Sequence, residues 1–310
     1  MEKLIIAGAG CAGLTAAIYA ARAELEPLLL SGSTLGGQLS ESTTVENYPG
    51  FPEGVTGPEV MADFQKQAER FGARIRYESV TAAKLKAGGP QHLTLNNGDE
   101  IECRSLIVAT GASPRWLGLE SEQKLRNRGV SSCATCDGAL YRKVPVAVVG
   151  GGDTAIEEAM FLTRFASKVM VIHRRDQLRA SKIMQERVFA NNKVELVWDS
   201  VVEQVMDVDK GEVTGVRIRN TRTEVLSTIE CRGLFLAIGH IPNTAPFKGQ
   251  LKTNADGYIE LPDGGRSMSN IEGVFVAGDC ADHVYRQAVT AAGMGCRAAI
   301  DAERWLQTRE

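Results

Sequence analysis

The stretch Leu4-Ile5-Ile6-Ala7-Gly8-Ala9-Gly10-Cys11-Ala12-Gly13 joins a short apolar run to a G-x-G-x-x-G glycine turn. An alanine-rich segment of helical character follows, from Leu14 to Glu24. A strand, a tight turn and a helix in this order are the context that a dinucleotide-binding fingerprint requires. The glycines let the backbone approach a pyrophosphate, and the helix N-terminus supplies N–H donors and a positive dipole end. The stretch therefore predicts a Rossmann-like fold.

A second fingerprint lies in the middle of the chain. The apolar run 146–149 leads into Gly150-Gly151-Gly152-Asp153-Thr154-Ala155, and apolar residues then recur at helical spacing. Two apolar strands that end in glycine, 106–111 and 234–239, flank this segment. We therefore predict an α/β protein with two Rossmann-like three-layer dinucleotide-binding domains, the second inserted in the first. Residues 1–113 and 242–310 would form one domain, and residues 114–241 the other.

The strands that follow the two fingerprints do not end as in a simple NAD site, where an acidic residue binds the ribose. The first strand ends at Ser31-Gly32. The second ends in His173-Arg174-Arg175, with Arg179 close behind. Arginine pairs with phosphate oxygens bidentately, so this set favours the 2′-phosphate of NADP. The alternative is a solvated basic loop.

Between the two fingerprints lies Cys133-Ala134-Thr135-Cys136-Asp137-Gly138, which has C-x-x-C spacing. No other pair among the seven cysteines has motif spacing, and the four histidines stand far apart. A zinc site would need two more ligands at motif spacing, so a redox pair is favoured over a metal site. The position of the pair suggests electron transfer. Asp137 is a candidate acid–base group, or only a turn residue.

Composition narrows the function classes. The chain has 310 residues, a formal net charge of -3 and 44% hydrophobic residues, which fits two globular domains. There is no basic excess of the kind that nucleic-acid binding requires, and no apolar run approaches a membrane span. The first strand begins at once, so we expect no signal peptide. Scattered, odd-numbered cysteines suggest reduced thiols. We therefore expect a cytoplasmic protein that binds neither nucleic acid nor a membrane.

Further polar segments of the expected first domain are candidates for ligand binding. Gly36-Gly37-Gln38-Leu39 and Glu46-Asn47-Tyr48-Pro49-Gly50 are surface loops or the lining of a polar ring system. Asp279 ends a late strand, where it suits either a polyol hydroxyl or a helix cap. Arg286-Gln287-Ala288 opens the last helix, whose N-terminus would stabilise negative charge on a bound ring.

Together these motifs resemble those of the low-molecular-weight, bacterial-type thioredoxin reductases over essentially the whole chain. The resemblance is carried by the two glycine turns, by Cys133–Gly138, by His173–Arg179, by Ala109–Ala112, by the two amide-rich loops, and by Gly278–Ala288. It implies a homodimeric FAD enzyme that uses NADPH to reduce thioredoxin through a Cys133–Cys136 redox disulfide. It also implies that the inserted domain rotates between the two half-reactions.

The resemblance assigns roles to single residues. Cys133 would attack thioredoxin, Cys136 would face the flavin, and Asp137 would act as the acid or base. The residues that would contact FAD are Gly8, Gly10, Gly13, Ser31–Gln38 (including Ser31, Gly32, Gly36, Gly37 and Gln38), Leu39, Asn47, Thr110, Gly111, Gly278, Asp279, Arg286, Gln287 and Ala288. Those that would contact NADPH are Gly150, Gly152, Asp153, Thr154, Ala155, His173, Arg174, Arg175 and Arg179. Two departures stand out, because Cys11 occupies a position that is commonly proline and Cys280 directly follows Asp279.

Three rival functions stay open at this point. A dithiol oxidase on the same scaffold would not need the three arginines, and a ferredoxin-type reductase would not need the two cysteines. A flavin-binding redox sensor without fast turnover is less easily excluded, and rapid NADPH consumption with thioredoxin as acceptor would exclude it.

Overall fold

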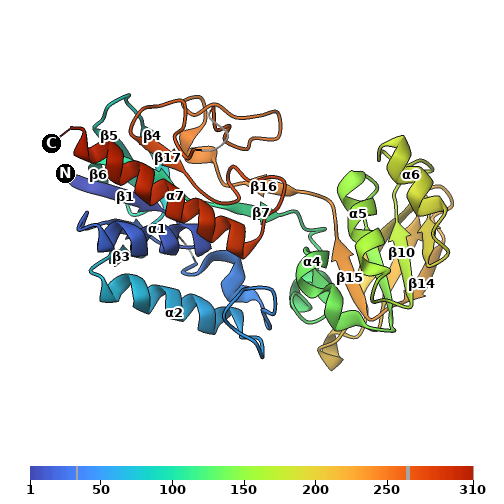
Figure 1. The fold of residues 1–310 in the computed structure, drawn as a ribbon. Coiled ribbons are helices and arrows are strands. Elements are labelled where there is room, and N and C mark those ends of the chain that lie inside the picture. The colour runs from blue at the N-terminus through green and yellow to red at the C-terminus, as the bar shows by residue number, and fades with distance from the viewer. Residues whose placement is uncertain (33, 263–265, 310) are drawn as a thin grey trace. The chain divides into compact units, whose positions relative to one another are not determined.

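The computed structural model describes residues 1–32, 34–262 and 266–309. The chain divides into two compact units (Figure 1). The first unit comprises residues 1–113 and 241–310, and the inserted unit comprises residues 114–240. The chain passes between them through β7 (Ala112–Pro114) and β16 (His240–Pro242), which pair as a two-stranded sheet. No helix in the described part of the chain is long and apolar enough to cross a membrane.

The first unit is built on a mainly parallel sheet. Five parallel strands occur in the order β3 (Arg74–Arg76), β2 (Leu28–Leu30), β1 (Glu2–Ala7), β6 (Glu100–Val108) and β17 (Val274–Val276). The hairpin of β4 (Val80–Lys84) and β5 (Gln91–Leu95) adds antiparallel strands along the first half of β6. The register pairs Ala7 with both Leu30 and Val108, and Val108 with Val276. The carboxyl ends of four strands therefore meet at one edge.

Three helices cover one face of this sheet. Helix α1 (Cys11–Arg22) lies between α2 (Gly57–Arg70) and α7 (Ala288–Gln307), as Figure 1 shows. The axes of α1 and α7 approach closely, because a Cβ at Gly295 would lie 2.1 Å from the carbonyl oxygen of Ala12. The opposite face is covered by β4, β5 and the segment around η4 (Ala245–Phe247), where Phe247 is fully buried. The sheet thus has a buried core on both faces.

The inserted unit has three layers. Its parallel sheet has the order β11 (Val194–Val197), β10 (Lys168–Ile172), β9 (Pro145–Val149), β15 (Gly233–Leu236) and β8 (Val130–Ser131). The helices that cover one face are α4 (Ala134–Asp137), α5 (Asp153–Leu162) and α6 (Lys182–Phe189). The other face packs on the antiparallel sheet of β12 (Ser200–Val205), β13 (Gly215–Asn220) and β14 (Leu226–Glu230).

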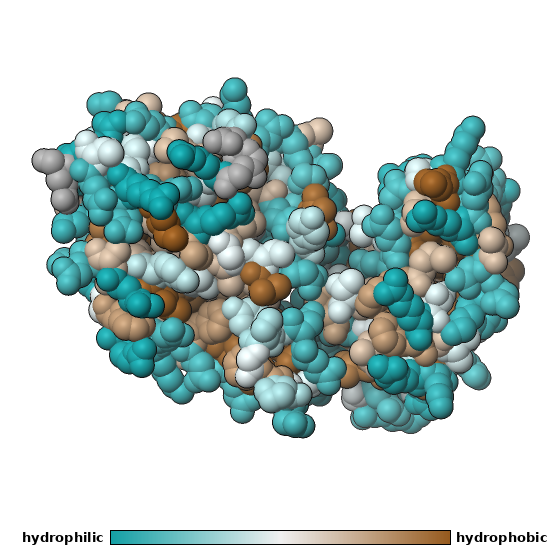
Figure 2. All heavy atoms as spheres, viewed as in Figure 1, coloured by the Kyte–Doolittle hydropathy of each residue, from teal (hydrophilic) through white to brown (hydrophobic). Residues whose placement is uncertain are grey.

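Shorter elements connect these layers. They are η1 (Gly37–Glu41), α3 (Glu120–Lys124), η2 (Gly138–Tyr141) and η3 (Val208–Lys210). The face of the molecule in Figure 2 is largely hydrophilic, with hydrophobic side chains in small separate patches. Both units have the predicted Rossmann-like architecture, so the predicted fold class is confirmed.

Candidate functional site

The first glycine turn lies at the edge where β1, β2, β6 and β17 end. Gly8 has φ +109°, and a Cβ there would lie 2.3 Å from the carbonyl oxygen of Ala109. A Cβ at Gly13 would lie 1.7 Å from the carbonyl oxygen of Gly8, so this glycine permits the tight turn into α1. A Cβ at Gly10 would meet no atom within 4 Å. Gly10 therefore presents bare backbone to open space at the start of α1, which fits a pyrophosphate.

The loop after β2 packs against this turn. The Gly36 N–H donates to the carbonyl of Ala9 over 3.0 Å, and a Cβ at Gly37 would lie 3.2 Å from the Cα of Gly10. Ser31 is buried and donates its hydroxyl to the carbonyl of Gly32. Ser33, which belongs to the predicted Ser31–Gln38 contact segment, lies outside the described residues. The described part of that segment thus lines the same edge.

Asp279 follows β17 at this edge, directly after Gly278, which has φ +80°. The Asp279 Oδ1 atom is buried and has no hydrogen-bond partner within the described residues. Burial, and after it the charge of Asp282, raise the pKa of the Asp279 carboxyl to about 6. A buried acceptor without a partner costs free energy unless a ligand supplies the donor. The site therefore fits a ligand hydroxyl, such as that of a ribitol chain.

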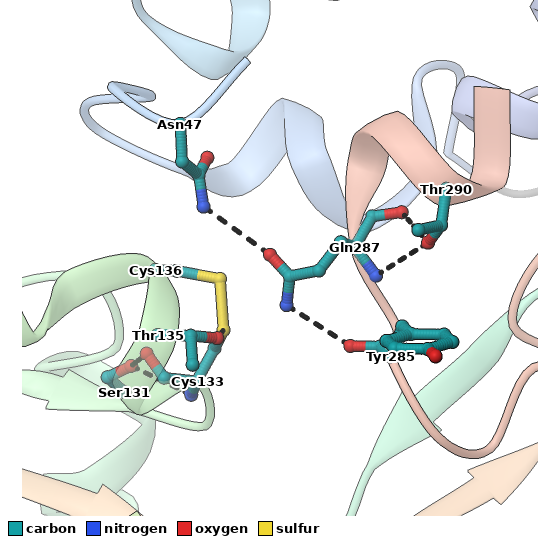
Figure 3. Close-up of a disulfide and its surroundings, with 8 residues drawn as sticks. All are labelled: Asn47, Ser131, Cys133, Thr135, Cys136, Tyr285, Gln287 and Thr290. Carbon is teal, nitrogen blue, oxygen red and sulfur yellow. Dashed lines mark hydrogen bonds between the residues drawn. A yellow bond between two sulfur atoms is a disulfide. The ribbon is translucent and has the colours of Figure 1, made fainter. Parts of the chain in front are cut away.

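Two loops far apart in sequence meet at the start of α7. The Asn47 amide donates to Gln287 Oε1 over 3.4 Å, and Gln287 Nε2 donates to the carbonyl of Tyr285 (Figure 3). Arg286 has φ +46°, and its N–H donates to Asp282 Oδ2. This turn leads directly into α7, which begins at Ala288. The residues Thr110 and Gly111 follow β6 and complete the edge.

The two unexpected cysteines of the first unit are buried. Cys11 is buried with its Sγ 3.6 Å from Met61 Sδ, and burial raises the pKa of its thiol to about 12. Cys280 is fully buried with its Sγ 3.4 Å from the carbonyl oxygen of Ala277, and burial raises the pKa of its thiol to about 11. Both thiols stay protonated at neutral pH, so neither is a reactive thiolate.

The inserted unit carries a disulfide between Cys133 and Cys136, with the Cα atoms 5.3 Å apart (Figure 3). Cys133 is the N-cap of α4, its N–H donates to Ser131 Oγ over 3.0 Å, and its Sγ lies 3.4 Å from Thr135 Oγ1. Cys136 is exposed and Cys133 is half-buried. The disulfide is therefore accessible to another thiol. Sequence reasoning missed Ser131, although its position two residues before Cys133 is a local signal.

Asp137 directly follows the disulfide and is half-buried. Burial raises the pKa of its carboxyl, and a hydrogen bond from Ser131 opposes that shift. A carboxyl group with a raised pKa holds a proton at higher pH than a surface aspartate does. This is the property that proton transfer to or from a neighbouring sulfur requires.

The second glycine turn connects β9 to α5. Gly150 has φ +156°, and a Cβ at Gly151 would lie 2.2 Å from His173 Nδ1. A Cβ at Gly152 would meet no atom within 4 Å, as at Gly10. The Asp153 carboxylate accepts hydrogen bonds from the N–H and the hydroxyl of Ser181. Thr154 and Ala155 continue the first turn of α5, so bare backbone again faces a possible phosphate.

Three exposed arginines follow β10 in the segment 174–179, here named the arginine segment. Arg174, Arg175 and Arg179 form no ion pair with any described residue. The Arg179 N–H donates to the carbonyl of Gly151 over 2.7 Å, which holds the segment beside the glycine turn. His173 is buried, and both its ring nitrogens contact backbone carbonyls rather than solvent.

The sequence gives no indication that one further residue, Arg222, belongs to this region. Arg222, in the turn between β13 and β14, pairs with Asp176 over 2.5 Å and with Asp199 over 3.0 Å. It thereby neutralises the carboxylate inside the arginine segment. No spacing rule connects positions 46 residues apart, so only the fold shows this contact.

Comparison with known proteins agrees with this geometry. The family model described as pyridine nucleotide-disulphide oxidoreductase matches residues 2–295. The chain belongs to this family. A thioredoxin reductase of Rickettsia conorii is 48% identical over 305 residues, which is 98% of each chain. One of Streptomyces coelicolor is 50% identical over 307 residues, covering 99% of this chain and 94% of that protein.

A solved structure extends the agreement to three dimensions. The crystal structure of thioredoxin reductase from Streptococcus pyogenes matches with a TM-score of 0.94 at 38% identity, over 99% of each chain. The resemblance to low-molecular-weight thioredoxin reductases is thereby confirmed. As a pyridine nucleotide-disulphide oxidoreductase, the protein is an enzyme of the oxidoreductase class.

Proposed function

We propose that the protein is an NADPH-dependent flavoprotein that reduces oxidised thioredoxin through FAD and the Cys133–Cys136 disulfide. The observation that carries this proposal is an accessible C-x-x-C disulfide in the same unit as a glycine turn and three exposed arginines. The first unit holds the other nucleotide fingerprint and, in Asp279 Oδ1, a buried carboxylate oxygen with no hydrogen-bond partner among the described residues. The names of the relatives support thioredoxin as the acceptor.

FAD would be held by the first unit. Its pyrophosphate would lie against Gly10 and the N-terminus of α1, and Asp279 would accept a hydrogen bond from a ribitol hydroxyl. Asn47 and Gln287 would place amide groups near the ring, and the N-terminus of α7 would favour negative charge on it. When bound, FAD would supply the redox group that passes two electrons from NADPH to the disulfide.

NADPH would be held by the inserted unit. Its pyrophosphate would lie at Gly152 and the N-terminus of α5. Its 2′-phosphate would pair with Arg174, Arg175 and Arg179, which are exposed and unpaired among the described residues. Planar guanidinium groups suit this phosphate better than the ribose hydroxyl of NADH.

The thiol chemistry follows from the two cysteines and Asp137. After reduction, the Cys133 thiolate attacks one sulfur of the thioredoxin disulfide, which forms a mixed disulfide and releases the other sulfur as a thiolate. The Cys136 thiolate then attacks Cys133 Sγ, which restores the Cys133–Cys136 disulfide and releases the second thioredoxin sulfur. Asp137 holds or delivers the proton that these thiolates exchange.

We also propose that the inserted unit rotates between the two half-reactions. The residues for NADPH and the redox disulfide belong to one unit, whereas those for the flavin belong to the other. The electron donor NADPH and the electron acceptor, the disulfide, therefore both need access to one flavin ring. The crossing at 112–116 directly follows Gly111, and the crossing at 239–243 begins at Gly239; these glycines have φ +69° and +97°. A cross-link between the units should stop turnover while one half-reaction persists, and full turnover in a locked molecule would refute rotation.

The function is tested by stopped-flow absorbance of the flavin-loaded protein. NADPH should bleach the flavin, and oxidised thioredoxin should restore its colour over many cycles. In Cys136→Ser the flavin should be reduced, but no electrons should reach thioredoxin. Absence of flavin reduction, or equal turnover in Cys136→Ser, would contradict the proposal. We also propose that the protein is a homodimer in the cytoplasm. Sedimentation measurements test the homodimer, and cell fractionation tests the location.

A further inference from the structure

The imidazole ring of His173 is buried between two parts of the proposed NADPH site. Its Nδ1 lies 3.0 Å from the carbonyl oxygen of Gly150, in the glycine turn. Its Nε2 lies 3.0 Å from the carbonyl oxygen of Gln177, in the arginine segment. The residue is only 5% exposed. The ring also fills the space in which a side chain at Gly151 would lie. His173 therefore joins the two parts directly.

The protonation state decides how well the ring can make both contacts. A neutral imidazole has one N–H donor and one lone pair, so it donates to only one of the two carbonyl oxygens. Its other nitrogen then presents a lone pair to a carbonyl oxygen, which is unfavourable. The imidazolium form donates to both. The geometry around His173 is thus satisfied only by the cation.

Burial and the neighbouring positive charges disfavour the imidazolium form of His173. Burial is the largest effect that lowers the pKa of His173, and the guanidinium groups of Arg179 and Arg175 lower it further. The hydrogen bonds to the carbonyl groups of Gln177 and Gly150 raise the pKa of His173. Without a ligand, the ring is therefore held towards its neutral form, with one carbonyl contact unsatisfied.

Three acidic groups on the neighbouring segments are already engaged. Arg222, from the turn after β13, pairs with Asp176 and Asp199. On α5, the Asp153 carboxylate accepts two hydrogen bonds from Ser181. The uncharged Trp198 ring lies edge-on to His173 at a centroid distance of 6.3 Å. A bound ligand would therefore bring a negative charge that these three carboxylates do not supply.

We propose that His173 is a positioning residue that takes up a proton from solvent when a 2′-phosphate binds to the arginine segment. This inference rests on the proposed NADPH site. The phosphate offsets the charge of the arginines, so the imidazolium forms and donates to both carbonyls, which fixes the glycine turn and the arginine segment relative to each other. NADH brings no charge to this place. Part of the preference for NADPH then comes from a buried histidine that does not touch the coenzyme.

The sign of the pH dependence follows from linkage. Binding raises the pKa of His173, so affinity for a 2′-phosphate is highest below the pKa of the free protein. It falls as pH rises through the pKa of the complex. A ligand without the 2′-phosphate should show no such fall from this group.

The test is an NMR titration of the histidine rings in the flavin-loaded protein. The probe is adenosine 2′,5′-bisphosphate, and AMP is the matched ligand without a 2′-phosphate. The titration midpoint of His173 should move to higher pH with the bisphosphate, by about one pH unit, and much less with AMP. His92, which pairs with Glu102 in the first unit over 3.0 Å, is the internal control and should not move.

A second readout uses proton uptake in weakly buffered solution with a pH indicator. Wild-type protein should take up protons on adding the bisphosphate near pH 7, and His173→Gln should take up fewer or release them. If the bisphosphate binds but the His173 midpoint does not move, or His173→Gln takes up protons as wild type does, the inference is wrong while the NADPH site stands. If the bisphosphate does not bind at all, the proposed NADPH site itself is overturned.

Discussion

The Asp153 carboxylate accepts two hydrogen bonds from Ser181, one from its backbone N–H and one from its hydroxyl, each 2.8 Å long. Asp153 is the first residue of α5, and Ser181 is the N-cap of α6, just after the arginine segment. These hydrogen bonds hold the pKa of the Asp153 carboxyl below its ordinary value. They fix the end of the arginine segment to the helix that would hold the pyrophosphate.

Replacing Asp153 by alanine removes both hydrogen bonds. We expect the KM for NADPH to rise about tenfold in Asp153→Ala and about threefold in Ser181→Ala, which keeps the backbone N–H. Asp153→Asn is the matched control, because its amide oxygen can still accept both bonds. Its KM should stay near that of the parent. If Asp153→Ala and Asp153→Asn both bound NADPH more tightly, repulsion between the carboxylate and the phosphates would outweigh the tether.

Substitutions at Gly10 and Gly13, in the same glycine turn, distinguish an effect on cofactor binding from an effect on folding. Gly10→Ala places a methyl group in open space, so the protein should fold with a Tm close to the parent. The same methyl group would occupy the expected pyrophosphate position, so FAD affinity should fall at least tenfold. Flavin fluorescence during reconstitution measures this affinity.

The contrasting variant is Gly13→Ala, whose Cβ would lie 1.7 Å from a backbone oxygen. We expect it to lower Tm strongly or to prevent folding, because backbone atoms cannot move aside. Normal FAD binding by Gly10→Ala would show that the pyrophosphate does not lie at this turn.

The sequence predicts the repeated parts of the fold well, because each follows a local rule. Residue spacing alone predicts both glycine turns, the strands before them and the helices after them. It does not predict which segments cover the other face of each sheet. The segment around Phe247 that covers the first sheet has no periodic pattern. Phe247 belongs to the same hydrophobic cluster as Leu28 and Val274, which are remote in sequence.

The candidate site shows the same limit. The arginines that follow β10 can be predicted because they stand where a known fingerprint expects an acidic residue. Arg222 cannot be predicted, because its contact with Asp176 depends on how the antiparallel sheet packs on the parallel one. The motif predicts that His173 contacts the coenzyme, and it gives no sign that the two ring nitrogens also lie against carbonyl groups of the chain. Side-chain direction is a tertiary property that a motif does not specify.

The buried carboxyl of Asp279 should make the FAD-free protein pH-sensitive. Its folded-state pKa of about 6 lies above the ordinary aspartate value of 3.8. The contribution of this group to stability is therefore complete below about pH 4 and is lost as pH rises through 6. Between pH 5 and pH 7 the free energy of unfolding should fall by about 1 kcal/mol relative to Asp279→Asn.

Urea denaturation of both FAD-free proteins at each pH measures this difference. Binding of FAD should remove it, because a hydroxyl donor stabilises the carboxylate. A difference between parent and variant that does not change with pH would show that Asp279 is already ionised in the free protein.

Asp137 and Ser131 should affect the rate of thiol exchange in different ways. Asp137→Asn cannot accept or release the proton, so the rate of thioredoxin reduction should fall about a hundredfold. Reduction of the flavin by NADPH should change little, because that step does not use the disulfide.

Ser131→Ala removes the hydrogen bond that opposes the raised pKa of Asp137. The pKa should then rise further, and the limb of the pH–rate profile that reports Asp137 should move to higher pH. Rapid-quench measurement of thioredoxin thiols between pH 5 and pH 9 follows both effects. Asp137 would be only a turn residue if Asp137→Asn kept the parent rate, and the Ser131 hydrogen bond would have no role if the profile of Ser131→Ala did not shift.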